Sequence, residues 1–159
     1  MQLSVGAHEK SFHRITDNVE EILSEESLNG LLSQNFYDGF QGIANSIKMS
    51  FLSFLIDCKK KNLRVAAYGA AAKGNTLINF CGIKLDLIEC VFDAAVSKQG
   101  KFLPGSHIPI LPPELIQDQY YDYIIILPWN LQHEIISQLG GLQEKGTRFV
   151  VFVPSFKEL

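Results

Sequence analysis

The residues best suited to chemistry lie in one stretch, Leu63–Phe80, which reads LRVAAYGAAAKGNTLINF. A short apolar run meets Gly69 and three alanines, after which Lys73 and Asn75 open a helical pattern. A strand, a tight turn and a helix start in this order leave backbone N–H groups and the positive end of the helix dipole free to bind an anion. The small residues would let a phosphate approach the backbone, and the lysine would add a mobile positive charge. The stretch therefore predicts a site for a phosphate-bearing ligand.

Neither standard phosphate-binding template fits this stretch in full. A G-x-x-x-x-G-K-[ST] loop needs a lysine where Asn75 stands, so triphosphate hydrolysis is not favoured. A G-x-G-x-x-G fingerprint needs a glycine where Ala71 stands, although Asp93 ends the next apolar run, where a ribose-binding acid is expected. The alternative is that Gly69 and the alanines serve only the close packing of strand and helix, and that Asp93 caps a strand end.

Two later loops are also unusual in composition. The first, residues 93–110, reads DAAVSKQGKFLPGSHIPI and carries Lys98, Lys101 and a Pro-Gly turn signal. The second places the single tryptophan, Trp129, and then Asn130 after a long apolar run. Because loops at the carboxyl ends of parallel strands share one rim of the sheet, we expect all three polar segments to meet there.

Each of these features also has a simpler explanation. The lysines could face solvent, the tryptophan could cover the sheet edge, and Asn130 could cap the following helix. Ligand binding is favoured because three unusual loops converge at the same end of one sheet. The four histidines are scattered, and the G-x-S-x-G pattern of a hydrolase nucleophile is absent. The residues thus indicate binding and no catalytic machinery.

Composition limits the class of protein. The chain has 159 residues and is 47% hydrophobic, enough for one domain with a substantial core. A formal net charge of -3 argues against nucleic acid as the main partner. No apolar run reaches the length of a membrane span, and no signal peptide is evident. Because Cys58, Cys81 and Cys90 lack the spacing of a zinc site or disulfide frame, we expect a cytoplasmic protein with reduced thiols.

The elements that would position these loops alternate between strands and helices. Apolar runs predict strands near residues 65–68, 85–93, 121–128 and 148–154, and weak alternation predicts an edge strand at residues 1–8. Helical patterns cover residues 16–24 and 27–33, with Thr16 and Ser27 as caps, then residues 36–61, a short turn after Pro112, and residues 130–142. The apolar residues of the long helix recur at spacings of three and four from Phe36 to Leu55.

This alternation predicts an α/β fold. We expect a Rossmann-like three-layer αβα domain over residues 36–159, with a mainly parallel sheet of about four or five strands. Residues 1–35 would form a strand remnant and short helices, an N-terminal extension of that domain.

Three motifs together, GAAAKGNTLINF, DAAVSKQGKFLPGSHIPI and ILPWN, give the chain its family resemblance. From about residue 36 to residue 154 it resembles the C-terminal domain of bacterial sugar C-methyltransferases, which use S-adenosylmethionine to methylate a carbon of a nucleotide-linked deoxysugar. The opening MQLSVGAH looks like the last strand of the preceding methyltransferase domain in that family. One departure is Val96, which stands where the family's D-x-x-P-x-K-Q-G run has proline.

The resemblance implies a division of labour. A cysteine-rich zinc module and a methyltransferase domain that binds S-adenosylmethionine and supplies the catalytic base would belong to the parent enzyme. This chain itself would bind neither zinc nor the methyl donor, would not methylate alone, and would work with the methyltransferase domain in cis or in trans. Its part would be to hold the nucleotide-linked deoxysugar. The implied substrate-binding residues are Gly69, Ala70, Lys73, Gly74, Asn75, Asp93, Lys98, Gln99, Gly100, Pro104, Gly105, Trp129 and Asn130.

Two other functions remain open from the residues alone. A module that binds NAD or another nucleotide would also explain the strand, turn and helix with Asp93 beyond them. A structural domain with a decayed site, docking a partner through the apolar stripe from Phe36 to Leu55, is the other alternative.

Overall fold

The computed structural model describes residues 17–159, so the predicted edge strand at residues 1–8 and the predicted cap at Thr16 lie outside the described residues. The chain divides into two compact units between Ile43 and Ala44. The division predicted after residue 35 stays a prediction.

The first unit is helical over its described part. Helix α1 spans Asp17–Leu28 and helix α2 spans Gln34–Asp38. The helix predicted over residues 27–33 is wrong, because α1 ends at Leu28 and Gly30 adopts a left-handed φ of 76° in the turn that follows.

The long helix predicted from Phe36 is interrupted. Helix α2 ends before Gly39, and α3 then runs over Phe40–Lys60. Of the apolar residues predicted to share one face, Phe51 and Leu55 are buried in the core of the second unit, whereas Phe36 is half exposed.

The second unit is built on a six-stranded sheet. The strands are β1 (Val65–Tyr68), β2 (Val91–Phe92), β3 (Ile110–Leu111), β4 (Tyr123–Ile126), β5 (Arg148–Val151) and β6 (Lys157–Glu158). Their order is β3-β2-β1-β4-β5-β6, and only β6 runs antiparallel to its neighbour. This is the strand order of a dinucleotide-binding fold, with the order reversing between β1 and β4. The α/β fold and the mainly parallel sheet are confirmed.

The sheet differs from the prediction in its short strands. It has six strands because the two-residue segments β3 and β6 each add an edge strand. The strand predicted over residues 85–93 is reduced to β2, since Leu87 donates its backbone N–H to Lys84 in a turn.

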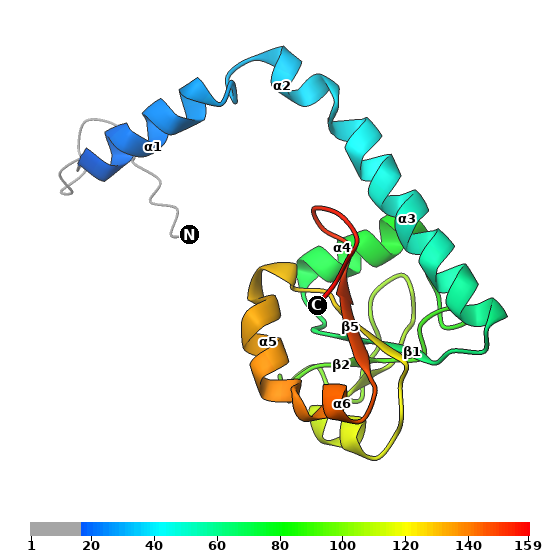
Figure 1. Cartoon of the computed structure of the whole chain (residues 1–159). Helices are drawn as coiled ribbons and strands as arrows, with labels where there is room; N and C mark the ends of the chain where they lie inside the picture. The colour runs from blue at the N-terminus through cyan, green and yellow to red at the C-terminus, as the bar shows by residue number, and fades with distance from the viewer. Residues whose placement is uncertain (1–16) are drawn as a thin grey trace. The chain divides into compact units, whose positions relative to one another are not determined.

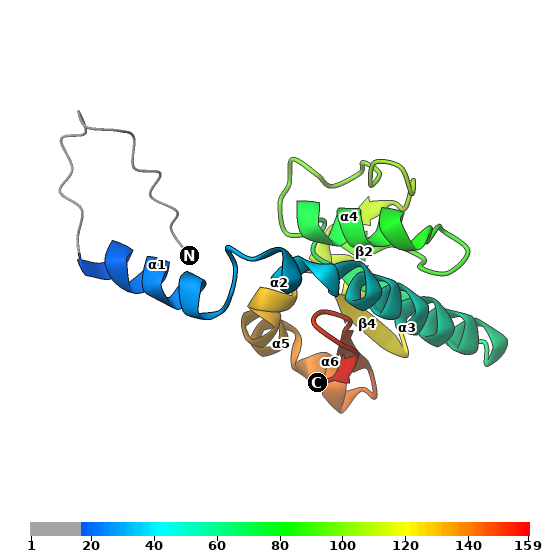
Figure 2. The ribbon, with the colours of Figure 1, turned by 90° about the horizontal axis from the view of Figure 1, so that it is seen from above.

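Helices cover both faces of the sheet, as Figures 1 and 2 show for α4 on one side and α5 on the other. Val65 and Ala67 face the core formed with α3 and α4 (Ala72–Cys81). Ala66 and Tyr68 face the core formed with α5 (Gln132–Leu139), α6 (Gly141–Glu144) and the 3₁₀ helix η1 (Pro113–Gln117). The alternation of strand side chains thus gives the predicted three layers.

The helix predicted over residues 130–142 is in three pieces. A short 3₁₀ helix, η2, covers Trp129–Leu131 and is followed by α5 and α6. Asn130 lies inside η2, and Leu131 immediately precedes α5, so the interpretation of Asn130 as the helix cap is wrong. Among residues 17–159, no helix has the length and apolar character needed to cross a membrane.

Candidate functional site

The turn after β1 is shaped by Gly69. Its φ is 92°, which side-chain-bearing residues rarely adopt, and its N–H donates to Phe92 O at 2.7 Å. A Cβ atom at this position would lie 2.6 Å from Cγ of Pro128. The turn therefore brings the end of β1 against the loop after β4. Only glycine combines the positive φ with the absence of a Cβ atom that this contact needs.

Gly74 allows α4 to pack closely on the sheet. It is buried, and a Cβ atom there would lie 2.5 Å from Cβ of Leu127. Gly74 therefore serves the close packing of strand and helix, which was the simpler explanation offered for the small residues of this stretch. Ala71 precedes α4, where the first helical N–H groups have no carbonyl partner within the helix.

Asp93 joins the loops that follow β1 and β2. It is 7% exposed, and its Oδ2 accepts the backbone N–H of Ala70 at 2.7 Å. The same oxygen lies 3.0 Å from Nζ of Lys98, while Oδ1 accepts the N–H of Ala95 at 2.8 Å. Both carboxylate oxygens are thus engaged within the protein.

The loop of residues 93–110 is folded back on itself and tied to α4. Gln99 Nε2 donates to the carbonyl of Asp93 at 3.0 Å, and the N–H of Gly100 donates to Ile110 O at 2.9 Å. Asn79 of α4 donates its Nδ2 to the carbonyl of Pro104 at 2.9 Å. Gly105 is pressed against the same Asn79 side chain and has a φ of 83°, which confirms the predicted Pro-Gly turn.

A pocket of about 430 Å³ opens between this loop and the start of α4. Its lining residues are Ala70, Ala71, Ala72, Asn75, Ser97, Lys98, Lys101, Phe102, Leu103, Pro104 and Ile110. The start of α4 contributes small side chains, and the loop contributes two ammonium groups and an apolar wall. The volume lies within the range of small-molecule sites.

The predicted residues divide into three groups. Ala70, Asn75, Lys98 and Pro104 line the pocket itself. Gly69, Gly74, Asp93, Gln99, Gly100 and Gly105 shape or brace the segments around it. Lys73, Trp129 and Asn130 are outside the lining, although Nζ of Lys73 lies 5.6 Å from the Trp129 ring centre.

Four residues of the pocket lining were not predicted from the sequence: Ser97, Leu103, Ile110 and the aromatic residue Phe102. Phe102 is the exposed one of the three apolar residues among them. It is 61% exposed, next to the buried Leu103. A single exposed aromatic residue forms no periodic pattern in the sequence. The one feature that could have pointed to Phe102 is its position between Lys101 and the Pro-Gly turn.

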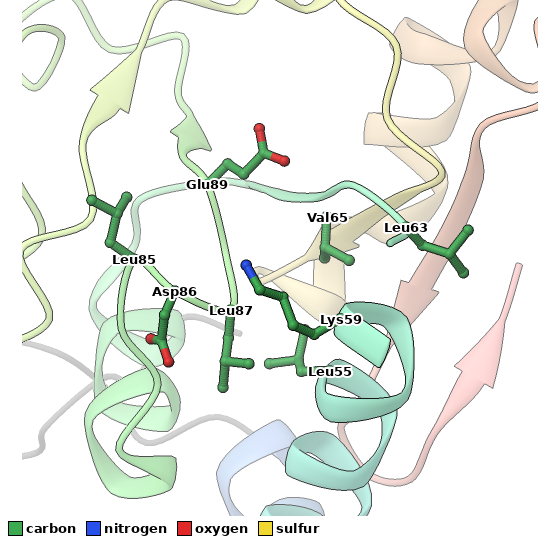
Figure 3. Close-up of a pocket in the computed structure, with 8 residues that line it drawn as sticks. All are labelled: Leu55, Lys59, Leu63, Val65, Leu85, Asp86, Leu87 and Glu89. Atoms are coloured by element: carbon green, nitrogen blue, oxygen red, sulfur yellow. The ribbon is translucent and has the colours of Figure 1, made fainter. Parts of the chain in front are cut away.

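A second, much smaller pocket lies at the amino edge of the sheet, where β1 begins (Figure 3). Its volume is about 50 Å³, and it is lined by leucines together with Lys59, Asp86 and Glu89. Figure 3 shows Lys59 reaching in from α3. Glu89 is already held by Arg64, with Oε2 and Nη2 2.6 Å apart. The volume is too small for a nucleotide.

The three cysteines are buried separately within the core. Burial raises the pKa of Cys81 to about 11, and it also raises the pKa values of Cys58 and Cys90. Such thiols are poor nucleophiles near neutral pH. Within residues 17–159, no three His, Cys, Asp or Glu side chains gather in a group suited to a metal ion.

Residues 1–154 match the sequence family described as the C-methyltransferase C-terminal domain. The chain belongs to this family. A curated relative, the C-methyltransferase NovU of Streptomyces niveus, is 34% identical over 142 residues, which are 89% of this chain and 34% of the relative. This C-methyltransferase C-terminal domain therefore spans about a third of the length of that relative.

A solved structure is also similar in part. The UDP-D-quinovosamine 4-dehydrogenase of Vibrio fischeri is 17% identical with a TM-score of 0.45, and the match covers 61% of this chain and 93% of that one. This likeness is too slight to support a conclusion about function.

Proposed function

We propose that this C-methyltransferase C-terminal domain is the substrate-side part of an S-adenosylmethionine-dependent enzyme that methylates a nucleotide-linked deoxysugar. Its pocket holds the phosphate-bearing end of that substrate. The methyl donor, the catalytic base and any structural zinc belong to the rest of the parent enzyme, so methyl transfer requires the methyltransferase domain in cis or in trans.

The observation that carries this proposal is the pocket between the start of α4 and the loop of residues 93–110. Ala71 and Ala72 line it at a helix N-terminus, where backbone N–H groups and the helix dipole favour an anion. Lys98 and Lys101 line it from the other side. Two amines and a helix start around one cavity suit a diphosphate, which carries negative charge on both phosphates.

Asp93 gives the pocket its geometry in this proposal. Its carboxylate holds Ala70 on one loop and Lys98 on the other, so the two walls keep a fixed separation. Lys98 is 40% exposed on its side chain, which leaves its ammonium group accessible to a ligand while Asp93 orients it. We therefore assign Asp93 a positioning role, in place of the ribose contact expected from the sequence.

Binding of NAD is the second candidate, because the strand order is that of a dinucleotide-binding fold. Two contacts speak against it. Pro128, from the loop after β4, lies so close to Gly69 that even a Cβ atom there would overlap it, at the place between β1 and β4 where a dinucleotide would cross. The N–H of Ala70, one of the donors available to a pyrophosphate at this turn, is bound by Asp93.

An amide-resolved NMR titration of the chain tests the proposal. A thymidine-diphosphate sugar, NAD and S-adenosylmethionine are added in parallel to wild type and three variants. We expect the sugar nucleotide alone to shift the amides of residues 70–75 and 97–103. Lys98→Ala and Lys101→Ala should each weaken its binding by roughly tenfold, the loss of one charge-assisted contact.

The matched control is Lys60→Ala, which removes the same charge at the exposed end of α3, outside the pocket lining. It should leave the affinity for the sugar nucleotide unchanged. Equal effects of all three lysine variants would reduce the binding to nonspecific charge attraction. Shifts with NAD in place of the sugar nucleotide would replace the proposal with the second candidate.

A further inference from the structure

Phe102 presents an aromatic ring on the wall of the pocket. The side chain is 61% exposed, whereas its pocket neighbours Leu103 and Ile110 are 2% and 5% exposed. Burying an aromatic side chain is strongly favourable, so a ring left at the mouth of a cavity has a large contact area available for a ligand.

Backbone pairings fix the main chain on both sides of Phe102. Phe102 forms an isolated bridge with Pro109, and the N–H of Ile110 donates to the carbonyl of Lys101 at 2.8 Å. On the other side, the N–H of Leu103 donates to Ile108 O at 2.9 Å. These pairings make residues 100–110 a folded-back segment, so the backbone that carries the ring is ordered before a ligand arrives and only the side chain remains to be ordered on binding.

The wall of the pocket formed by the start of α4 carries only small side chains. Ala70, Ala71 and Ala72 line the pocket with methyl groups, and Asn75 adds an amide. An aromatic ring on one side and small side chains on the other fit a flat molecule better than a branched one. Lys101, together with Lys98 beside Asp93, lies in the same lining and favours a flat molecule that also carries negative charge.

We infer that Phe102 is a stacking subsite for the planar heterocyclic base of a nucleoside diphosphate. This inference rests on the proposed function and deepens it, because it assigns the nucleotide half of the substrate to this chain. A base has a π face that stacks on an aromatic ring, and such stacking is largely independent of which base is present. A saturated sugar ring has no π face and would contact the aromatic ring only through its C–H groups. The lysines hold the diphosphate that joins the base-bearing nucleoside to the sugar.

The experiment compares two diphosphate probes, one with the nucleoside and one without it. Thymidine 5′-diphosphate and inorganic pyrophosphate are titrated into the full chain by NMR, with Phe102→Ala, Phe102→Trp and the control Val96→Ala. Val96 is 80% exposed on the same loop and does not line the pocket. Because Phe102 and Val96 are both exposed, all three variants should keep the wild-type spectrum away from the loop.

We expect Phe102→Ala to weaken binding of thymidine diphosphate by roughly tenfold, as the loss of one stacked base requires. The same variant should change pyrophosphate binding less than about twofold, since pyrophosphate has no ring to stack. Phe102→Trp should restore the affinity, and its added fluorescence should be quenched by thymidine diphosphate and not by pyrophosphate. Val96→Ala should behave as wild type.

Four results would overturn the inference. An equal loss for both probes would mean that Phe102 only shapes the loop, and no loss for either would mean that the ring serves another contact, such as a second protein domain. Wild type that binds both probes equally well would remove the base subsite while leaving the phosphate site intact. Wild type that binds neither would remove the proposed function together with the inference.

Discussion

At the scale of single residues, Asp93 ties together the two loops that form the pocket. It accepts the N–H groups of Ala70 and Ala95 and pairs with Lys98. Its place at the end of a strand could be predicted from the sequence. Its partners could not, because they depend on how the loop of residues 93–110 folds back, and that path is set by long-range backbone pairings with Ile110.

Asp93→Ala should lower the free energy of unfolding by about 3 kcal/mol, because two backbone N–H groups lose their acceptor in a poorly solvated place. Lys98→Ala removes the same ion pair from its more exposed side and should cost less than about 1 kcal/mol. Urea unfolding of both variants measures the two values. Similar losses in the two variants would assign the stability to the ion pair and not to the backbone acceptor.

At the scale of elements, the close packing of α4 on the sheet depends on Gly74. The turn after β1 and the helix that follows were predicted correctly, since a strand, small residues and a helical pattern are local signals. The break at Gly39 was missed because the apolar spacing continues across it from Phe36 into α3. The length of β2 was overestimated because the apolar run of residues 85–93 contains a turn.

Gly74→Ala should lower the free energy of unfolding by about 2 kcal/mol, since the added methyl group would overlap Leu127 and force α4 away from the sheet. Gly141→Ala is the matched control at the start of α6, where a Cβ atom would meet nothing within 4 Å. That change should be neutral or stabilising by up to about 1 kcal/mol. Thermal unfolding followed by circular dichroism compares them, and equal stabilities would rule out the predicted overlap.

At the scale of the whole molecule, the buried thiols and phenols make the free energy of unfolding depend on pH in the alkaline range. Burial raises the pKa of Cys81 from 9.0 to about 11, and the pKa values of Cys58, Cys90 and Tyr121 are also raised, chiefly by burial. Between the unfolded and folded pKa values the unfolded chain binds fewer protons, so the free energy of unfolding falls as the pH rises.

Urea unfolding at pH values from about 8 to about 10.5 should therefore show a steady loss of stability, beginning near the pKa of an unperturbed thiol. Cys81→Ala should make this loss less steep, because one group no longer titrates differently in the two states. A free energy of unfolding that stays level over this range would contradict the burial of these groups.

The general architecture could be predicted from the sequence because alternating strands and helices leave few arrangements of one domain. The sheet edges could not, since β3 and β6 are two residues long and exist through pairing with neighbours. Phe102 could not be predicted as a pocket residue for a related reason. The pocket that it lines forms only when segments about thirty residues apart along the chain come together.

The short strand β6 has a consequence for self-association. It pairs Glu158 with Val150 and Lys157 with Val151, so it covers the outer side of the apolar strand β5. An uncovered β5 would offer a row of unpaired N–H and C=O groups to any other extended chain. The two residues that cover it are charged and exposed, and a strand this short and charged is a poor template for further pairing. Detaching residues 157–158 would therefore leave the outer edge of β5 unpaired, and we expect the protein to aggregate at high concentration as a result.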